Sequence, residues 1–276
     1  MIAYLNINSY RYKYCDILEL LHHQYVDIMC VAETKLDQTY PDGQFIAENY
    51  VMYRRDGISS RSGGLITYVS TAISSRRRSD LEPVNNECIT IEYTQDRKKS
   101  IVFVCYRSPS TNVKMYLEAL TKCMDKALCE TETIIIIGDL NQNMLQRTTS
   151  NEIRDFADMF ALKNFIKSAT CYKNPENHTL VDLLLCNKSR QFSSAGVIEN
   201  GLSDVHHFIF GVLSHQYIPN KPKTITYQSY KSCDENDFNK DLSETPFYVG
   251  AVFDDVEDKM VLSKITHRRC QYPCPH

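Results

Sequence analysis

The chain has 276 residues, of which 43% are hydrophobic and 24% are charged, with a formal net charge of −3. These values are ordinary for a globular protein, and they exclude a chain that binds nucleic acid through bulk positive charge. The longest purely apolar run, 134–137, is far shorter than the ~20 residues needed to cross a bilayer, so no membrane partner is expected. The first residues lack the apolar core of a signal peptide, which favours an intracellular location.

Strand-like and helix-like stretches alternate through the first 214 residues. The strands are rich in β-branched and aromatic residues, and the helices show apolar residues at helical spacing. In chain order, strands are expected at 1–7, 27–32, 64–69, 88–93, 100–106, 133–137, 180–186 and 208–213, and helices at 15–23, 115–128 and 151–161. Strands interleaved with helices predict an α/β protein.

The pattern weakens after about Ser214, and Pro219 and Pro222 mark a boundary. We therefore expect one domain at 1–214 and, at 215–276, a linker and an acidic, poorly ordered tail with a short helix near 237–242. Residues 234–258 hold nine acids and one base, so without this −8 segment the rest of the chain carries +5.

Basic clusters in the first domain are the candidates for contacts with phosphate groups. For any one cluster, a solvated loop is the commoner explanation. The clusters are Arg54–Arg55, Arg76–Arg78, 97–99 and Arg107.

Eleven cysteines invite a disulfide interpretation, but several lie inside apolar runs, where free cysteine behaves as a small buried hydrophobe. Near the C-terminus, the spacing of Cys270, Cys274 and His276 fits no common zinc pattern. The cysteines therefore predict neither a disulfide framework nor a zinc site.

Several polar residues share one placement, directly beside or within an apolar strand. Each has an ordinary explanation alone, as a turn former, a capping acid or a satisfied core residue. Their joint occurrence indicates a site, because ligands bind where strand ends converge and a buried carboxylate needs a partner or a metal. The residues are Asn6, Glu33, Asp139, Asn141, Asp182, Asp204 and His206.

Six blocks in fixed order resemble the endonuclease/exonuclease/phosphatase superfamily, and most closely the apurinic-site-type endonuclease domain of non-LTR (LINE-like) retrotransposons. The blocks are LNINS, VAETKLD, CYRSP, GDLNQN, TLVDLLLCN and GLSDVHH, and the resemblance covers roughly residues 1–214. It implies a four-layer α/β sandwich of two packed mixed β-sheets flanked by helices. It also implies a double-stranded DNA substrate, an intracellular and nuclear location, and a reverse transcriptase in the parent element; no reverse-transcriptase pattern follows here.

The resemblance also implies roles for matching positions. Glu33 would be the main ligand of Mg²⁺, with Mn²⁺ as an alternative, and Asn6 would help to hold the metal-bound phosphate or its water shell. Asp139 would orient and activate the attacking water, and Asn141 would bind that water or a phosphate oxygen. Hydrolysis would leave a 3′-hydroxyl, able to prime reverse transcription.

The remaining positions would assist the phosphate or contact DNA. His206 would donate to the scissile phosphate and Asp182 would orient it from behind. The others are Tyr106 at the phosphate or leaving oxygen, Asp204 near the metal, and Thr170, Arg107, Arg54 and Arg55 as DNA contacts.

Two departures from the family pattern leave alternatives open. Val205 separates Asp204 from His206, and His207 follows, so His207 is a rival for the catalytic histidine. Successive side chains in a strand point to opposite faces, so only one of the two can face the metal. Arg107 replaces the small or amide residue often found after the tyrosine; it either grips a phosphate or is merely exposed.

Three functions are compatible with this sequence. The first is a Mg²⁺-dependent, DNA-nicking endonuclease of a retrotransposon. The second is an apurinic-site repair nuclease or a small-molecule phosphatase of the same superfamily; the absence of tryptophan disfavours the repair nuclease. The third is an inactive, truncated remnant of the element. Against it, every matched catalytic position keeps the expected residue type.

Overall fold

In the computed structural model, residues 1–57, 63–146, 151–199, 201–214 and 234–244 are described. The chain divides into two units, Met1–Ile218 and Pro219–His276. The second unit contributes helix α4 (Glu235–Glu244), where a shorter helix was expected. The predicted disorder of the tail and its Cys270, Cys274 and His276 lie outside the described residues.

The first unit contains two six-stranded sheets, each mixing parallel and antiparallel neighbours. In the first sheet the strand order is β11 (Phe192–Ile198), β12 (Phe208–Leu213), β1 (Ile2–Asn6), β2 (Ile28–Ala32), β4 (Leu65–Ser70) and β3 (Tyr50–Arg55). In the second sheet it is β5 (Ser74–Arg77), β6 (Glu87–Gln95), β7 (Lys98–Tyr106), β8 (Ile134–Asp139), β10 (Asp182–Cys186) and β9 (Lys163–Asn164).

Alternating side chains of β1 show how the layers pack. Ile2 and Tyr4 belong to the core shared with β6, β7 and β8, whereas Ala3 and Leu5 belong to a second core. Because successive side chains point to opposite faces of a sheet, β1 is buried on both sides. The inner face packs against the other sheet and the outer face against a helix, as the predicted four-layer sandwich requires.

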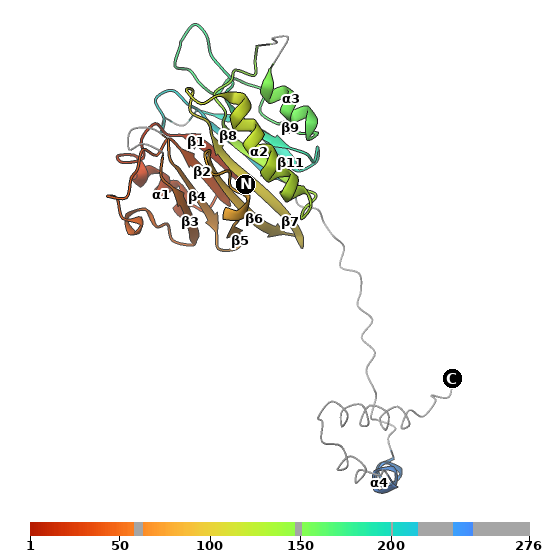
Figure 1. The fold of residues 1–276 in the computed structure, drawn as a ribbon. Helices are drawn as coiled ribbons and strands as arrows, with labels where there is room; N and C mark the ends of the chain where they lie inside the picture. Colours follow the sequence, from red (N-terminus) through yellow and green to blue (C-terminus); the bar gives the residue numbers. More distant parts are fainter. Residues whose placement is uncertain (58–62, 147–150, 200, 215–233, 245–276) are drawn as a thin grey trace. The chain divides into compact units, whose positions relative to one another are not determined.

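Helices cover the outer faces of both sheets. Helix α1 (Tyr14–His22) buries Ile17 and Leu21 in the second core. Helices α2 (Val113–Leu128) and α3 (Glu152–Met159) lie over the sheet that contains β8 (Figure 1). Asparagine side chains begin both of the latter helices: Asn112 and Asn151 accept backbone N–H groups of the first turn, which would otherwise lack partners. Short 3-10 turns complete the unit at Asp42–Phe45 and Ser79–Leu81.

In each sheet, a parallel pair of strands brings polar residues at the strand ends to the same edge. β1 runs parallel to β2, so Asn6 and the residue after Ala32 lie at the same end. β7 runs parallel to β8, which pairs Tyr106 with Asp139. Asp182 is directly opposite Asp139 on the antiparallel strand β10.

Gly138 allows β7 and β8 to meet immediately before Asp139. Its φ is +151°, and a Cβ atom there would lie 1.8 Å from the carbonyl oxygen of Cys105. Only glycine fits this approach, so the GDLN block owes its first residue to packing.

Candidate active site

Asn6 joins two carboxylates that belong to different sheets. Its Nδ2 donates to Glu33 Oε1 at 2.8 Å and to Asp139 Oδ2 at 3.0 Å. Asn6 and Asp139 are each only 1% exposed. The hydroxyl of Tyr4 accepts the backbone N–H of Asp139 at 3.0 Å, which adds a second hydrogen bond between β1 and β8. The ends of β1, β2 and β8 therefore bring two carboxylates and one amide into contact.

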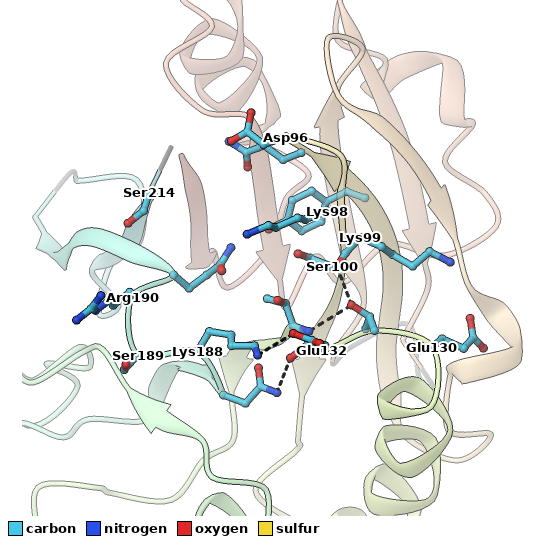
Figure 2. Close-up of a pocket in the computed structure, with 16 residues that line it drawn as sticks. Asp96, Lys98, Lys99, Ser100, Glu130, Glu132, Lys188, Ser189, Arg190 and Ser214 are labelled. Atoms are coloured by element: carbon cyan, nitrogen blue, oxygen red, sulfur yellow. Dashed lines mark hydrogen bonds and ion pairs between the residues drawn. The ribbon is translucent and has the colours of Figure 1, made fainter. Parts of the chain in front are cut away.

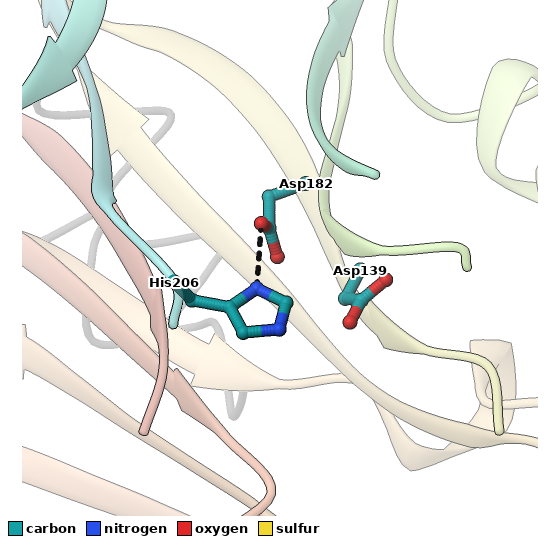
Figure 3. Close-up of side chains that lie close together, drawn as sticks. All are labelled: Asp139, Asp182 and His206. Atoms are coloured by element: carbon teal, nitrogen blue, oxygen red, sulfur yellow. Dashed lines mark hydrogen bonds and ion pairs between the residues drawn. The ribbon is translucent and has the colours of Figure 1, made fainter. Parts of the chain in front are cut away.

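His206 and Asp182 form a buried pair beside this set (Figure 3). His206 Nδ1 lies 2.9 Å from Asp182 Oδ2, and the side chains are 10% and 0% exposed. One ligand atom from each of Asp139, Asp182 and His206 lies within 4.8 Å of the others. Because Asp182 engages Nδ1, the other ring nitrogen is left to face the site.

Electrostatics in the cluster shift two pKa values away from their usual range. Burial, together with the charge of Asp182, raises the pKa of Asp139 to about 7, although His206, Asn141 and Asn6 act in the opposite direction. Burial alone would lower the pKa of His206, but hydrogen bonds with Asp182 and Cys171 and the charges of Asp182 and Asp139 raise it to about 11. The site thus holds a carboxyl poised near neutrality and a histidine kept protonated.

Asn141 and Tyr106 complete the rim. The backbone N–H of Asn141 donates to Asp139 Oδ1 at 2.8 Å, and its Nδ2 donates to the carbonyl of Arg107 at 2.8 Å. Tyr106 is 4% exposed, and burial and the charges of Glu33 and Asp139 raise its pKa well above the usual range. Its hydroxyl therefore keeps its proton and can only act as a hydrogen-bond partner.

The structure does not bring every expected residue into this cluster. Asp204 has a 74% exposed side chain and pairs with Lys13 at 3.6 Å. Thr170 is fully buried, and its Oγ1 accepts the backbone N–H groups of Val181 at 3.2 Å and Asp182 at 3.1 Å. Thr170 thus positions the start of β10 rather than facing a ligand.

The three arginines expected at DNA have internal partners. Arg54 donates to Asp42 and Asp56 and to two carbonyls, and its side chain is 10% exposed. Arg55 pairs with Glu82 at 3.3 Å. Arg107 is 4% exposed, and within the part of the chain that the structure describes its side chain donates only to backbone carbonyls. Arg54 and Arg107 are thus largely buried, whereas the side chain of Arg55 stays 25% exposed.

The structure favours His206 over His207 as the histidine of the site. The ring of His207 stacks on Tyr172 with centroids 4.0 Å apart, and Tyr172 also contacts His178 at 4.2 Å. Tyr172 and His178 belong to a hairpin that an isolated antiparallel β-bridge between Cys171 and Thr179 closes, and His207 lies against it. A second backbone β-bridge pairs Cys171 with His206. The hairpin therefore stands beside the candidate active site.

Two neighbours of the cluster were not anticipated from the sequence. Tyr4 could have been found, because it lies two residues before Asn6 and so on the same face of the strand. Cys171 gave no such signal. Burial alone would raise its pKa, but the hydrogen bond with His206 lowers it below the usual value.

A cavity of about 630 Å³ opens away from this cluster, at the other end of β7 and β8 (Figure 2). Lys98, Lys99, Lys188 and Arg190 line it together with carboxylates. Lys188 pairs with Glu132 at 3.2 Å, so part of the positive charge in the cavity is balanced by a carboxylate.

No helix among the described residues is long and apolar enough to cross a membrane.

Comparison with known proteins agrees with this architecture. Residues 100–210 match the family model described as endonuclease-reverse transcriptase. No curated protein matches the sequence.

Solved structures with the same fold include three informative examples. The endonuclease domain of TRAS1, a telomere-specific non-LTR retrotransposon, is 11% identical with a TM-score of 0.61, over 75% of this chain and 94% of that one. The Xenopus laevis APE2 catalytic domain is 15% identical with a TM-score of 0.56, over 78% and 94%. The 3′ phosphatase NExo from Neisseria, bound to a product DNA hairpin, is 14% identical with a TM-score of 0.59, over 78% and 99%. This chain therefore has the endonuclease/exonuclease/phosphatase fold, and its residues 100–210 match the endonuclease-reverse transcriptase family model.

Proposed function

We propose that the protein is a Mg²⁺-dependent phosphodiesterase that nicks double-stranded DNA and leaves a 3′-hydroxyl, in the manner of a retrotransposon endonuclease. The observation that carries the proposal is the joining of Glu33 and Asp139 by Asn6, beside the Asp182–His206 pair. A nuclear location follows from the proposed substrate and belongs to the same proposal.

The residues present fit a hard divalent cation. The carboxylates of Glu33 and Asp139 are oxygen donors of the kind Mg²⁺ prefers, and the amide of Asn6 lies between them. Asp182 Oδ1 is buried and has no hydrogen-bond partner among the described residues, and the carboxylates of Asp139 and Asp182 lie close together. A cation would offset that excess of negative charge, as a buried carboxylate requires. Glu33 and Asn6 would hold it, with Asp139 beside them.

When bound, the cation would spread the negative charge that builds on the phosphate oxygens. Asp139 would accept the proton of the attacking water, because it is a buried carboxylate that Asn6 holds beside Glu33, where the cation would sit. Asn141 fixes the Asp139 carboxylate through its backbone N–H. Orientation of this kind supplies much of the rate in phosphoryl transfer.

His206 would donate to the phosphate from the opposite side. Its raised pKa keeps it protonated at neutral pH, and Asp182 fixes its ring. Tyr106 would add a neutral hydroxyl to the same oxygens. These groups are already placed before the substrate arrives, which is the condition for strong electrostatic stabilisation.

The hairpin beside the site supports a nucleic-acid substrate. Lys173 and His178 are exposed on it, and Tyr172 stands half-buried against His207. Aromatic rings and a lysine side chain beside a phosphodiesterase site are suited to contacts with DNA bases and with the DNA backbone. A small phosphate ester would need none of these groups.

The test is a nicking assay on supercoiled plasmid with Mg²⁺, with EDTA as the metal-free control. The wild-type protein should produce open circles whose 3′ ends a DNA polymerase can extend. Glu33→Ala and Asp139→Asn should each lose about 10²-fold or more in rate. Cleavage confined to abasic oligonucleotides would indicate a repair nuclease instead. A folded protein that cleaves neither substrate would indicate an inactive remnant and would refute the proposal.

A further inference from the structure

Arg107 follows strand β7 directly and is almost completely buried, yet the structure gives its charge an unusual set of partners. Its Nε donates to the carbonyl of Leu140 at 2.7 Å, and its Nη2 donates to the carbonyl of Asn141 at 2.7 Å. Nη1 donates to the carbonyls of Thr111 and Ser108. All four acceptors are backbone carbonyls, so the guanidinium acts as a brace between two loops rather than as an ion-pair partner.

The main chain of Arg107 grips the same turn. Its N–H donates to the carbonyl of Asp139 at 2.9 Å, and its carbonyl accepts Asn141 Nδ2 at 2.8 Å. Three consecutive residues, 139–141, are therefore bonded to this one arginine. The turn needs holding, because Asn141 has a φ of +50°, a conformation that residues other than glycine keep only when their surroundings enforce it.

An arginine suits this task better than other residues. Its planar fork directs several N–H donors along different lines, whereas a lysine presents all its donors from one atom. Burial lowers the pKa of Arg107, which is the sign of a cation removed from water. Such a group is tolerated only when its donors are satisfied, and the loop carbonyls satisfy them.

We propose that Arg107 is a positioning residue that holds the Asp139–Asn141 turn in its working geometry, and that it does not contact DNA. This inference rests on the proposed function for its kinetic consequence. Its structural part, the bracing of the turn, can be tested on the metal-free protein alone. A displacement of the turn by about 1 Å would lower the rate by roughly 10²-fold.

The experiment compares the wild type with Arg107→Lys and Arg107→Gln. The matched control is Arg78→Lys, because Arg78 is also buried but pairs with Asp80, Glu92 and Glu130. Hydrogen exchange is measured for the peptide 138–146 without metal. Steady-state kinetics are then measured on two substrates. One is an intact oligonucleotide duplex that contains a sequence nicked in the plasmid assay, and the other is bis(p-nitrophenyl) phosphate, a small ester that offers no DNA contacts.

The proposal expects exchange in peptide 138–146 to become at least about tenfold faster in both Arg107 variants, with glutamine the more affected, and to stay unchanged in Arg78→Lys. It expects kcat to fall about 10²-fold on both substrates, with KM within about twofold. A raised KM on DNA with normal cleavage of the small ester would overturn it and make Arg107 a DNA contact. Unchanged exchange in the peptide would overturn it whatever the activity. If the wild type cleaves nothing, the proposed function fails while the exchange result still decides the brace.

Discussion

Replacing Asp182 by asparagine tests how the site keeps His206 protonated. The amide has nearly the shape of the carboxylate, and its oxygen can still accept from Nδ1, now 2.9 Å from the carboxylate oxygen. What disappears is the negative charge that holds the pKa of His206 at about 11. Burial, which lowers that pKa, would then prevail.

The size of the effect follows from this shift. Without the charge, the pKa of His206 should fall to roughly 6.5 or below, so that only about 1% of the imidazole is protonated at pH 8.5. The wild type should remain protonated there. If the protonated ring donates to the phosphate, Asp182→Asn should be impaired about 100-fold more at pH 8.5 than at pH 5.5. The pKa of Asp139 should also fall, because the charge of Asp182 helps to raise it.

Stability should change with pH in the direction that linkage dictates. A histidine whose folded pKa is raised contributes stability that is complete below about 6.5, its unfolded pKa, and is lost as the pH rises toward about 11. Breaking a buried pair costs roughly 3–5 kcal/mol, and we expect the low end because Asp139 is relieved of repulsion. The gap in unfolding free energy between wild type and Asp182→Asn should therefore be widest near pH 6 and narrow at alkaline pH.

Two measurements check this prediction. Nicking rates between pH 5.5 and 9 give the ratio of wild type to Asp182→Asn, and the imidazole signals of His206 followed by NMR in the metal-free proteins give its pKa directly. A ratio that stays constant across this range, or a His206 pKa that is the same in both proteins, would refute the reasoning. Asp182 would then act on the ring by shape alone.

Three further variants test the packing around the site. Asp139→Asn should stabilise the metal-free protein above pH 7 by at most ~4 kcal/mol, because a carboxyl whose pKa is raised from 3.8 to about 7 destabilises the fold once it is ionised. This gain in unfolding free energy should vanish below pH 4. A loss of stability in urea unfolding at pH 8 would contradict this prediction. Gly138→Ala should lower the free energy of unfolding by more than ~3 kcal/mol, because the added Cβ would clash with the carbonyl of Cys105. Gly43→Ala is the control, since a Cβ there has nothing within 4 Å, and equal melting temperatures of the two variants would count against the close approach of β7 and β8. Thr170→Val should cost roughly 2 kcal/mol or more by leaving two buried N–H groups without an acceptor, while Thr170→Ser should retain most of the stability; the reverse order in thermal unfolding would be incompatible with that role.

The central strands could be predicted because their residue types leave little choice. β1, β2, β8 and β10 are buried along their whole length, and each reads as an apolar run in the sequence. The strands β3, β5 and β11 were not expected. β5 contains two serines and two arginines, and β11, at the sheet edge, buries only Phe192, so neither shows the alternation that marks a strand.

The residues of the candidate site could be predicted only in part, since Asp204, also expected near the metal, is exposed and pairs with Lys13. Polar residues at strand ends indicated Asn6, Glu33, Asp139 and His206, since parallel strands bring their ends to one edge. The fate of an arginine depends on loops distant in sequence. Arg54 bonds to residues 12 to 17 positions away, and local sequence does not show whether a guanidinium meets such partners or solvent.

The proposed reaction requires a divalent cation bound where Glu33 and the His206 region meet. Mn²⁺ can take the place of Mg²⁺ at oxygen ligands and broadens the NMR signals of nearby nuclei. In the wild type, low concentrations of Mn²⁺ should broaden the imidazole signals of His206, with competition by Mg²⁺; in Glu33→Gln the same concentrations should leave them sharp. His206 signals that stay sharp in the wild type, or that broaden equally in both proteins, would contradict the account.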